Sequence, residues 1–453
     1  MTSTVNRPPK PASQQAWLGR FALSIYRALL YLALPLVAVA AWRRCRKVRH
    51  PQLIAKLSPK ACWLARFGVT PAQLPTGGIW VHAVSVGETR SIFPLLEHLH
   101  QQHPDLPITL TSGSTQGAVQ ALQFCPVPIY HQMIPYDYPF AVNKFLKRLR
   151  PKLVLMVETE IWPNLYHACT QQQIPLMLIN ARLKAGSFEA YQRWAKPLMQ
   201  QALQHPQLIG AQFDTDRERF IALGAPEQRV KTLGNLKFDI QVPDQIQQDA
   251  QLWRQQLAHP ERFVWVAAST HSDEEALMIK AHQQLLKTHP DALLILVPRH
   301  ADRFGEVAEL LASYPQQLSW QKRSQNQDSP PDGSIYLADT MGELLLWFAV
   351  SNAAFIGGSM VNFGGHNILE PAALAKPVLS GTHYQNLTSL YDSFIADQGL
   401  QVCATPEALA QTLSQLADNP DQQTRWGQQA LQALHNQTGS LAKHYHEIRR
   451  FLS

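Results

Sequence analysis

The segment GGIWVHAV (77–84) and the stretch SVGETRSIFPLLEHLHQQ (85–102) that follows it decide the fold class of this chain. The first is an apolar run typical of a buried strand, and the second carries apolar residues at helical spacing after a glycine turn. Because strands that alternate with helices form βαβ units, the pattern predicts a parallel sheet in an α/β fold. The same unit recurs downstream, with strands expected at 107–113, 152–158, 174–180 and 206–212.

A polar stretch at 242–261 interrupts this alternation near the middle of the chain, and the composition of 321–333 predicts a surface loop. Between and beyond them the alternation restarts, with strands expected at 262–269, 291–299, 333–339, 352–358 and 376–381. We therefore predict two doubly wound, Rossmann-like domains, residues 50–245 and 246–453. A ligand-binding cleft is expected between the carboxyl ends of their sheets.

The composition is that of a globular protein with two cores. The chain has 453 residues, of which 45% are hydrophobic and 16% charged. Its net charge of +7 suits a nucleotide, a nucleic acid or an anionic membrane surface, without choosing among them. Five cysteines lie far apart with no CxxC pair, which predicts neither a disulfide framework nor a zinc site. The histidines are not spaced as metal ligands, so no metal site is expected.

Residues 1–49 are predicted to form a membrane anchor with a basic flank. Between Phe21 and Trp42 the only charged residue is Arg27. Five cations follow directly: Arg43, Arg44, Arg46, Lys47 and Arg49. A spanning helix needs about 20 apolar residues, which are reached here if Arg27 extends to the interface. A helix lying in the interface and a buried core helix are the alternatives. The positive-inside rule then predicts that the rest of the chain is cytoplasmic.

Carboxylates collect just after the expected strands of the first half, where α/β sheets bind ligands. Glu88 follows a strand-to-helix turn and could act as a general base, or it could merely stabilise the first helical turn. Glu158 and Glu160 end an apolar strand, where carboxylates are costly to bury without partners; a capping arrangement explains them equally well. Lys237, near the domain junction, is either a counter-charge or a solvated lysine.

The second half has the features of a nucleotide site. Arg299 ends an expected strand, and its planar guanidinium suits phosphate. The segment GGSMVNFGGHNILEPAA (357–373) has four glycines, which allow close approach of the backbone to a ligand, and then Asn367 and Glu370. These two residues also match a helix-capping box, so a structural role stays open. The absence of a GxGxxG or Walker pattern counts against NAD binding and ATP hydrolysis.

Eleven short motifs resemble, in order and approximate spacing, those of the bacterial 3-deoxy-D-manno-octulosonic acid (Kdo) transferases. They are HAVSVGE, IPYDYP, ETEIWPN, NARL, GNLKFD, STH, VPRH, DTMGEL, GGS, GGHNILEPAA and GTHYQN, from about residue 77 to residue 387. Each is weak alone, but eleven in order are specific. STHSDEE and RHADRF depart from the family's more frequent STHEGEE and RHPERF, and the family's ER-x-G pattern is not found in 43–76.

The resemblance implies a GT-B fold and a lipid A-specific enzyme of lipopolysaccharide biosynthesis. Such an enzyme inverts the anomeric centre as it transfers Kdo from CMP-Kdo to the tetra-acylated lipid A precursor, without a metal or other cofactor. It works at the cytoplasmic face of the bacterial inner membrane, beside anionic lipids, and has no nucleic-acid partner. By motif, Glu88 would be the general base, with Glu158 and Lys237 supporting the transition state. The implied CMP-binding residues are Pro298, Arg299, Met341, Gly342, Glu343, Asn367, Ile368, Leu369 and Glu370.

Two other functions are compatible with this fold class. One is an enzyme acting on UDP-sugars, such as a lipid-linked GlcNAc transferase or a non-hydrolysing epimerase; an epimerase would not need the apolar segment at 21–49. The other is a membrane-tethered nucleotide-binding scaffold without activity. The joint presence of Glu88, Glu158, Lys237 and Arg299 argues against a scaffold.

Overall fold

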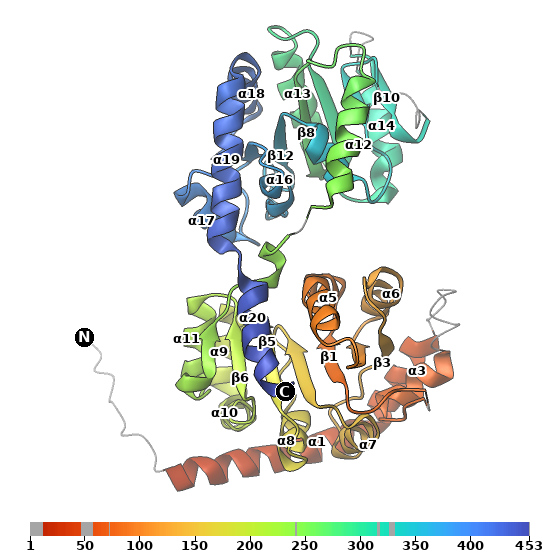
Figure 1. Cartoon of the computed structure of the whole chain (residues 1–453), viewed down its shortest axis with the longest axis vertical. Coiled ribbons are helices and arrows are strands. Elements are labelled where there is room, and N and C mark those ends of the chain that lie inside the picture. Colours follow the sequence, from red (N-terminus) through yellow and green to blue (C-terminus); the bar gives the residue numbers. More distant parts are fainter. Residues whose placement is uncertain are drawn as a thin grey trace, which may run out of the picture. The chain divides into compact units, whose positions relative to one another are not determined.

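The structure is a computed structural model, and it describes residues 12–46, 58–71, 73–240, 242–314, 318–325 and 331–452. The chain divides into two units. Unit 1 comprises Met1–Asp239 with Thr438–Ser453, and unit 2 comprises Ile240–Gln437. Each unit is built on one parallel sheet with helices on both faces (Figure 1). This architecture confirms the predicted fold class.

Unit 1 contains a seven-stranded sheet in the order β3-β2-β1-β4-β5-β6-β7. Its strands are β1 (Ile79–Ala83), β2 (Ile108–Ser112), β3 (Tyr130–Met133), β4 (Leu153–Val157), β5 (Leu176–Ala181), β6 (Leu208–Ala211) and β7 (Val230–Thr232). The chain runs outward from β1 to β3 and then returns to β4 on the other side of β1. Open α/β sheets bind ligands at such a switch point, outside the carboxyl ends of the strands.

Helices of unit 1 cover both faces of this sheet, and alternate side chains of β1, β4, β5 and β6 point into two separate cores. In one core Trp80 packs edge-on against Phe145 with ring centroids 4.7 Å apart, whereas Val81 lies in the other. The helices are α3 (Pro59–Arg66), α4 (Val86–Ser91), α5 (Phe93–Gln102), α6 (Thr115–Phe124), α7 (Pro139–Leu149), α8 (Pro163–Gln171), α9 (Ala185–Ala190), η1 (Tyr191–Ala195), α10 (Lys196–Ala202), α11 (Asp214–Ala222), η2 (Glu227–Arg229), η3 (Leu236–Phe238), α20 (Ser440–Ile448) and η6 (Arg449–Phe451).

Unit 2 has a second seven-stranded parallel sheet, in the order β10-β11-β9-β8-β12-β13-β14, with its switch point between β8 and β12. The strands are β8 (Val264–Thr270), β9 (Leu293–Pro298), β10 (Trp320–Lys322), β11 (Ile335–Leu337), β12 (Ala353–Ile356), β13 (Val378–Ser380) and β14 (Gln401–Val402). The helices are α12 (Asp244–Gln255), α13 (Glu274–Leu285), η4 (Ala301–Arg303), α14 (Phe304–Ala312), η5 (Arg323–Gln325), α15 (Leu344–Val350), α16 (Leu369–Ala373), α17 (Thr388–Ala396), α18 (Pro406–Asp418) and α19 (Pro420–Gln437).

All ten expected strands are present, and four further strands were not expected: β3, β7, β10 and β14. Each of the four lies at an edge of its sheet. The segment 321–333, predicted to be a loop, begins inside β10, and its residues 326–330 lie outside the described ones. The polar stretch 242–261 is not a plain linker, because α12 occupies most of it.

The C-terminal segment packs in unit 1, although the sequence placed all of 246–453 in the second domain. After α19 the chain returns as α20, and the carboxylate of Asp239 accepts hydrogen bonds from the backbone at the start of that helix. His444 of α20 is buried, and its Nε2 accepts the backbone N–H of Asn180 at 3.1 Å. These contacts join residues at least 200 positions apart, so no local pattern could reveal them.

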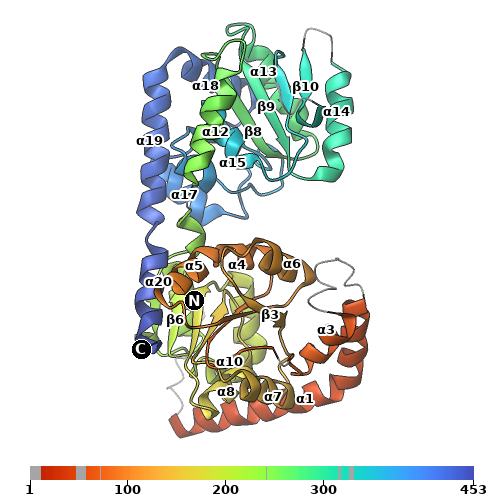
Figure 2. The same cartoon turned by 45° about the vertical axis from the view of Figure 1, so that its right-hand side comes forward.

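The N-terminal helix α1 (Ala12–Arg46) is long and apolar enough to cross a membrane. It nevertheless lies along unit 1, next to α7, α8, α10 and α3 (Figures 1 and 2). Arg27 Nε donates to Asn164 Oδ1 at 2.7 Å, and Tyr26 donates its hydroxyl proton to Asp137 at 3.1 Å. Arg27, the only charged residue of the apolar stretch, is therefore hydrogen-bonded to α8 in the rest of unit 1. Of the predicted basic flank, Lys47 and Arg49 lie outside the described residues.

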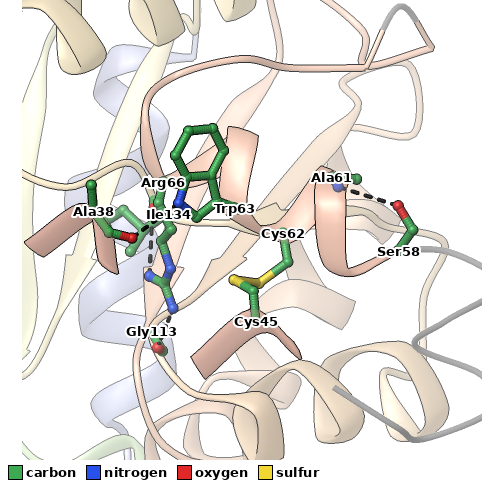
Figure 3. Close-up of a disulfide and its surroundings, with 9 residues drawn as sticks. All are labelled: Ala38, Cys45, Ser58, Ala61, Cys62, Trp63, Arg66, Gly113 and Ile134. Atoms are coloured by element: carbon green, nitrogen blue, oxygen red, sulfur yellow. Dashed lines mark hydrogen bonds between the residues drawn. A yellow bond between two sulfur atoms is a disulfide. The ribbon is translucent and has the colours of Figure 1, made fainter. Parts of the chain in front are cut away.

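The end of α1 is joined to α3 by a disulfide between Cys45 and Cys62 (Figure 3). The cysteine spacing predicted no disulfide framework, so this pairing was not expected from the sequence. The Cα atoms of the two residues are 5.7 Å apart because α3 folds back on the end of α1, where Trp63 Nε1 also donates to the carbonyl of Ala38 at 3.1 Å. Their separation of 17 residues carries no recognised motif, so the proximity is a tertiary property.

Candidate functional site

The turn after β1 fixes Glu88 at the switch point of the first sheet. Ser85 caps α4, its hydroxyl oxygen accepting the N–H of Glu88 at 3.3 Å. The Glu88 carboxylate accepts the N–H of Val84 at 2.7 Å and the hydroxyl proton of Ser85 at 2.9 Å. The helix-stabilising role considered for Glu88 is thus real. It does not exclude a second role, because the side chain is only half-buried.

The surroundings of Glu88 favour a carboxylate that can take up a proton. Burial raises the pKa of Glu88, the hydrogen bonds from Val84 and Ser85 oppose the rise, and the nearby carboxylates of Glu158 and Glu160 add to it. A raised pKa makes a carboxylate a stronger base. The switch point of unit 1 therefore gathers three carboxylates, of which Glu88 has an elevated proton affinity.

Glu158 lies immediately beyond β4 with a backbone φ of 62°, in the left-handed region that costs a non-glycine residue free energy. Its Oε1 pairs with Lys237 Nζ at 3.0 Å. Strand alternation would place Glu158 and Glu160 on one face, but the strand ends at Val157 and the two carboxylates have different partners. Of the two interpretations of Lys237, a counter-charge and a solvated lysine, this ion pair supports the counter-charge.

Glu160 is held by aromatic neighbours. Trp162 Nε1 donates to Glu160 Oε2 at 2.6 Å, and His82 Nε2 lies 3.6 Å from the same oxygen. Burial acts to raise the pKa of Glu160, but the nearby His82 ring and the hydrogen bond from Trp162 outweigh it and leave the pKa below its usual value. Glu160 is therefore a stably ionised group.

A buried amide network positions Lys237, and sequence reasoning missed it. Asn180 Oδ1 accepts the N–H of Leu236 at 3.1 Å, while Gln212 Nε2 donates to the Asn180 carbonyl at 2.9 Å. Asn235 donates to Gln212 at 3.1 Å, and its own Oδ1 accepts the N–H of Lys237. These side-chain amides therefore hold the short turn η3, which carries Lys237, in a fixed position. The asparagines of NARL and GNLKFD were the signal that could have revealed this role.

In unit 2, the expected nucleotide-site residues lie at the end of β9 and in the segments that follow β11 and β12. β9 ends at Pro298, and Arg299 continues the sheet by donating its backbone N–H to the carbonyl of Thr270 at 3.0 Å. The Arg299 side chain is exposed. A guanidinium at the carboxyl edge of a parallel sheet is well placed to bind an anion.

The 341–343 segment forms an exposed turn before α15. Gly342 has a φ of 93°, a conformation that favours glycine, and Met341 is 67% exposed although it is apolar. Glu343 is paired with Arg323 at 2.8 Å and accepts a short hydrogen bond from Thr340. Burial acts to raise the pKa of Glu343, but these two bonds lower it overall. Glu343 therefore stays ionised and fixes the turn.

The glycine-rich loop after β12 is organised by a buried carboxylate that the sequence did not single out. Glu274, at the start of α13, accepts the backbone N–H groups of Gly358 at 2.6 Å, Ser359 at 3.1 Å and Met360 at 2.9 Å. A fourth N–H, from His271, lies 3.2 Å away. Four donors on one carboxylate lock the loop to the start of α13. The paired glutamates of STHSDEE were the only local hint.

The loop ends at α16, where the expected capping box is only partly formed. Asn367 Oδ1 accepts the N–H of Leu369 at 3.2 Å, so Asn367 has a local structural role. The residue at the cap position is Ile368, and it is buried, as is Leu369. Asn367 is exposed, and Glu370 is half-buried. The structure thus gathers the expected CMP-binding residues of unit 2 around the carboxyl edge of its sheet.

Residues 61–240 match the family model of the 3-deoxy-D-manno-octulosonic-acid transferases (kdotransferases). The 3-deoxy-D-manno-octulosonic acid transferase of Haemophilus influenzae is 33% identical over 423 residues, which are 92% of this chain and 96% of that protein. The solved C-terminal CMP-Kdo binding domain of WaaA from Acinetobacter baumannii is 33% identical and covers 42% of this chain and 98% of that one, with a TM-score of 0.40.

The UDP-GlcNAc 2-epimerase of Neisseria meningitidis shares the fold, with a TM-score of 0.53 over 83% of this chain and 99% of that chain. At 14% identity this likeness shows the fold alone. The match to the Haemophilus influenzae enzyme, by contrast, extends over nearly the whole of both chains at 33% identity. On that evidence the chain belongs to the 3-deoxy-D-manno-octulosonic acid (Kdo) transferases, glycosyltransferases of lipopolysaccharide biosynthesis.

Proposed function

We propose that this enzyme transfers Kdo from CMP-Kdo to the tetra-acylated lipid A precursor, with inversion and without a resident metal. The observation that supports it best is the meeting of Glu88, Glu158 and Lys237 at one switch point. Glu88 has the raised proton affinity of a base, and Lys237 brings a cation to the same edge of the sheet. Sequence motifs alone could not establish that these side chains share one edge.

In the proposed reaction Glu88 takes the proton of an acceptor hydroxyl as its oxygen attacks the anomeric carbon of Kdo. The new carbon–oxygen bond forms while the bond from that carbon to the phosphate oxygen breaks, and CMP leaves with the electron pair. Lys237, oriented by Glu158, stabilises charge that develops during the displacement. A single displacement of this kind inverts the anomeric centre.

The donor nucleotide is assigned to unit 2. Arg299 and Asn367 present exposed polar groups at the carboxyl edge, and Met341 offers an exposed apolar surface. Glu274 fixes the glycine loop, so that its backbone is already shaped before a ligand arrives. A preorganised site loses less conformational entropy on binding.

Product analysis tests this proposal. Purified full-length protein is incubated with CMP-Kdo and the tetra-acylated precursor, and the lipid product is weighed by mass spectrometry. One or more added Kdo residues, of inverted anomeric configuration by NMR, support the proposal, and activity in EDTA supports metal independence. Transfer from UDP-sugars instead of CMP-Kdo would favour the UDP-sugar alternative.

We also propose that α1 anchors the enzyme with its axis in the plane of the membrane surface rather than across the bilayer. One face of α1 packs on unit 1: Leu23, Ala41 and Cys45 are buried, and Arg27 is bonded to Asn164. A spanning arrangement would separate these contacts or draw unit 1 into the bilayer. The packed face therefore supports the interfacial alternative.

The opposite face of α1 is exposed and apolar from Trp17 to Val39. Its large side chains are spaced three or four residues apart, as one face of a helix requires. They are Trp17, Phe21, Ile25, Leu29, Leu32, Leu36 and Val39. Leu32 and Leu36 are 80% and 76% exposed. Arg43, Arg44 and Arg46 follow at the C-terminal end, which matches the chemistry of anionic lipid head groups.

A further inference from the structure

Two histidines meet at the switch point of the sheet in unit 2. His271 directly follows β8, and His366 lies in the loop after β12, the strand that pairs with β8. Their Nε2 atoms are 2.6 Å apart, and their rings are nearly parallel, with centroids 4.9 Å apart. Phe363 stacks on His271 with ring centroids 3.7 Å apart. None of these three side chains was a candidate site residue in the sequence.

The contact between the two rings constrains their protonation. A hydrogen bond between imidazole nitrogens needs one N–H donor and one unprotonated acceptor. If His271 and His366 both carried a proton on Nε2, two donors would face each other and the bond would be lost. The pair therefore stays bonded only while at least one of the two facing nitrogens is free of a proton.

Arginine and histidine side chains lie near the pair, and the buried carboxylate of Glu274 accepts the backbone N–H of His271. His300, after β9, lies with its ring centroid 5.8 Å from that of His271, and Arg299 precedes it in the chain. Arg303, in η4, acts on His271 as well, but it is held by Glu275 of α13 at 2.7 Å. Apart from Glu275, all the groups whose charges act on His271 are cationic or histidine side chains.

These surroundings keep both rings neutral near pH 7. Burial, followed by the charge of Arg299, lowers the pKa of His366 to about 4. Burial, followed by His300, also lowers the pKa of His271, with Glu275 acting in the opposite direction. An anion bound among these groups would offset the repulsion between them and allow a ring to become cationic.

We propose that His271 and His366, together with Arg299, bind the phosphate of the donor nucleotide, and that the pair takes up a proton when the phosphate binds. The N–H···N bond then opens, and each Nε2–H donates to a phosphate oxygen instead. One proton enters from solvent and forms an N–H bond on the Nε2 that was the acceptor, and no bond between heavy atoms changes. This inference rests on the proposed function, because it names further residues of the same donor site.

The geometry favours a phosphate as the ligand. The exposed guanidinium of Arg299 supplies a permanent charge, and the half-buried His366 ring directly precedes Asn367. Charge-assisted hydrogen bonds to an anion are stronger than the neutral N–H···N bond that they would replace. Neutral rings in the empty site also cost less to bury than cations would.

Isothermal titration calorimetry with CMP tests the proposal. Titrations are run in buffers of different ionisation enthalpy, between about pH 7 and pH 8.5, where the phosphate of CMP is already ionised because its second pKa is about 6. We expect net proton uptake by the wild-type protein, and CMP affinity that falls as the pH rises. Cytidine, which lacks the phosphate, should bind without proton uptake.

The variant His366→Gln should bind CMP about 10-fold more weakly and lose most of the proton uptake and pH dependence. His271→Gln, a second substitution in the pair, should do the same, and circular dichroism verifies folding of both. His289→Gln is the matched control, since His289 pairs with Asp418 at 3.1 Å at the surface of unit 2. Unchanged proton uptake in both pair variants would overturn the inference while the proposed function stands. Absence of CMP binding to the wild-type protein would overturn both.

Discussion

Lys237 Nζ lies 3.0 Å from Glu158 Oε1, although 79 positions separate the two residues in the chain. The pair forms at the carboxyl end of β4 because a buried amide network fixes the turn that carries Lys237. Both side chains are partly exposed, so the ion pair itself contributes little to stability, about 0–1 kcal/mol. In the proposed reaction the pair instead orients the cation of Lys237 toward the reacting groups.

We therefore expect Lys237→Met to lower kcat by about 10²–10³ while leaving the folded protein nearly as stable as the wild type. Lys231→Met is the control, because Lys231 forms a comparable ion pair with Glu447 in unit 1, at 2.8 Å. Steady-state kinetics and thermal unfolding separate the two effects. Equal losses of kcat in both variants would contradict a specific role for Lys237.

Glu88→Gln should lower turnover by about 10²–10⁴, because the base is removed while size and part of the hydrogen bonding remain. CMP affinity should be unchanged, since the nucleotide is assigned to unit 2. Because the pKa of Glu88 is raised, wild-type kcat/KM should fall as the pH drops through that raised value, earlier than for an ordinary carboxylate. Near-normal turnover of the variant would rule out this base.

Ser85→Ala provides the control for the structural role of Glu88. It removes the side-chain cap of α4, at a cost of about 1 kcal/mol, and one hydrogen bond to the Glu88 carboxylate, which keeps its bond from the Val84 N–H. If Ser85→Ala loses as much activity as Glu88→Gln, the effect of the latter comes from the helix cap and not from proton transfer.

Arg299→Ala should weaken CMP binding by about 1.5–3 kcal/mol, the contribution of a charge-assisted bond to phosphate. Arg425→Ala, at an exposed position of α19, is the control and should leave the affinity unchanged. UDP should bind the wild-type protein much more weakly than CMP does. Calorimetry measures all three, and tighter binding of UDP would favour a UDP-sugar enzyme.

The in-plane anchor predicts equal membrane depths along α1. Spin labels at Ile25, Leu32 and Val39 should report similar depths, whereas a spanning helix, rising about 1.5 Å per residue, would separate the outer two by about 20 Å. Leu32→Lys with Leu36→Lys should release protein from anionic vesicles, and Leu252→Lys, at an exposed leucine of α12, should not. Labels at clearly graded depths would establish a spanning helix.

Stability should fall in mild acid, because His444 is buried with Nε2 accepting a backbone N–H. Burial lowers the pKa of His444 from 6.5 to about 4. The unfolded chain therefore binds more protons between these values, and this contribution to stability is lost as the pH falls from about 6.5 to 4. Its upper limit is about 3 kcal/mol. Denaturant unfolding against pH should show a smaller acid loss in His444→Gln.

The sequence revealed the interior strands and missed those at the edges, for a physical reason. An interior strand such as β4 is covered on both faces, so all five of its residues are buried and its sequence is a continuous apolar run. The edge strand β3 has an exposed tyrosine and a half-exposed histidine at its start, and β7 is only three residues long. Such segments carry no hydrophobic pattern to recognise.

The residues of the candidate site also fall into those that the sequence identified and those that only the structure revealed. Glu88, Glu158, Lys237 and Arg299 could be named from motifs, because each directly follows a strand or lies in a recognisable turn. The partners that orient them could not: Asn180, Gln212 and Glu274 act through contacts between distant segments. Likewise, periodicity showed that α1 is apolar, but only its packing on unit 1 distinguished a docked face from an exposed one.

By itself the sequence determined the two parallel-sheet domains, the positions of their interior strands along the chain and the family motifs, since these depend on local hydrophobic patterns and turn residues. Tertiary structure alone decided which residues meet: Cys45 with Cys62, α20 with unit 1, and His271 with His366. Such meetings depend on how parallel strands are ordered and how helices return to them. Neither the order of the strands in a sheet nor the return path of a helix can be read from residue spacing along the chain.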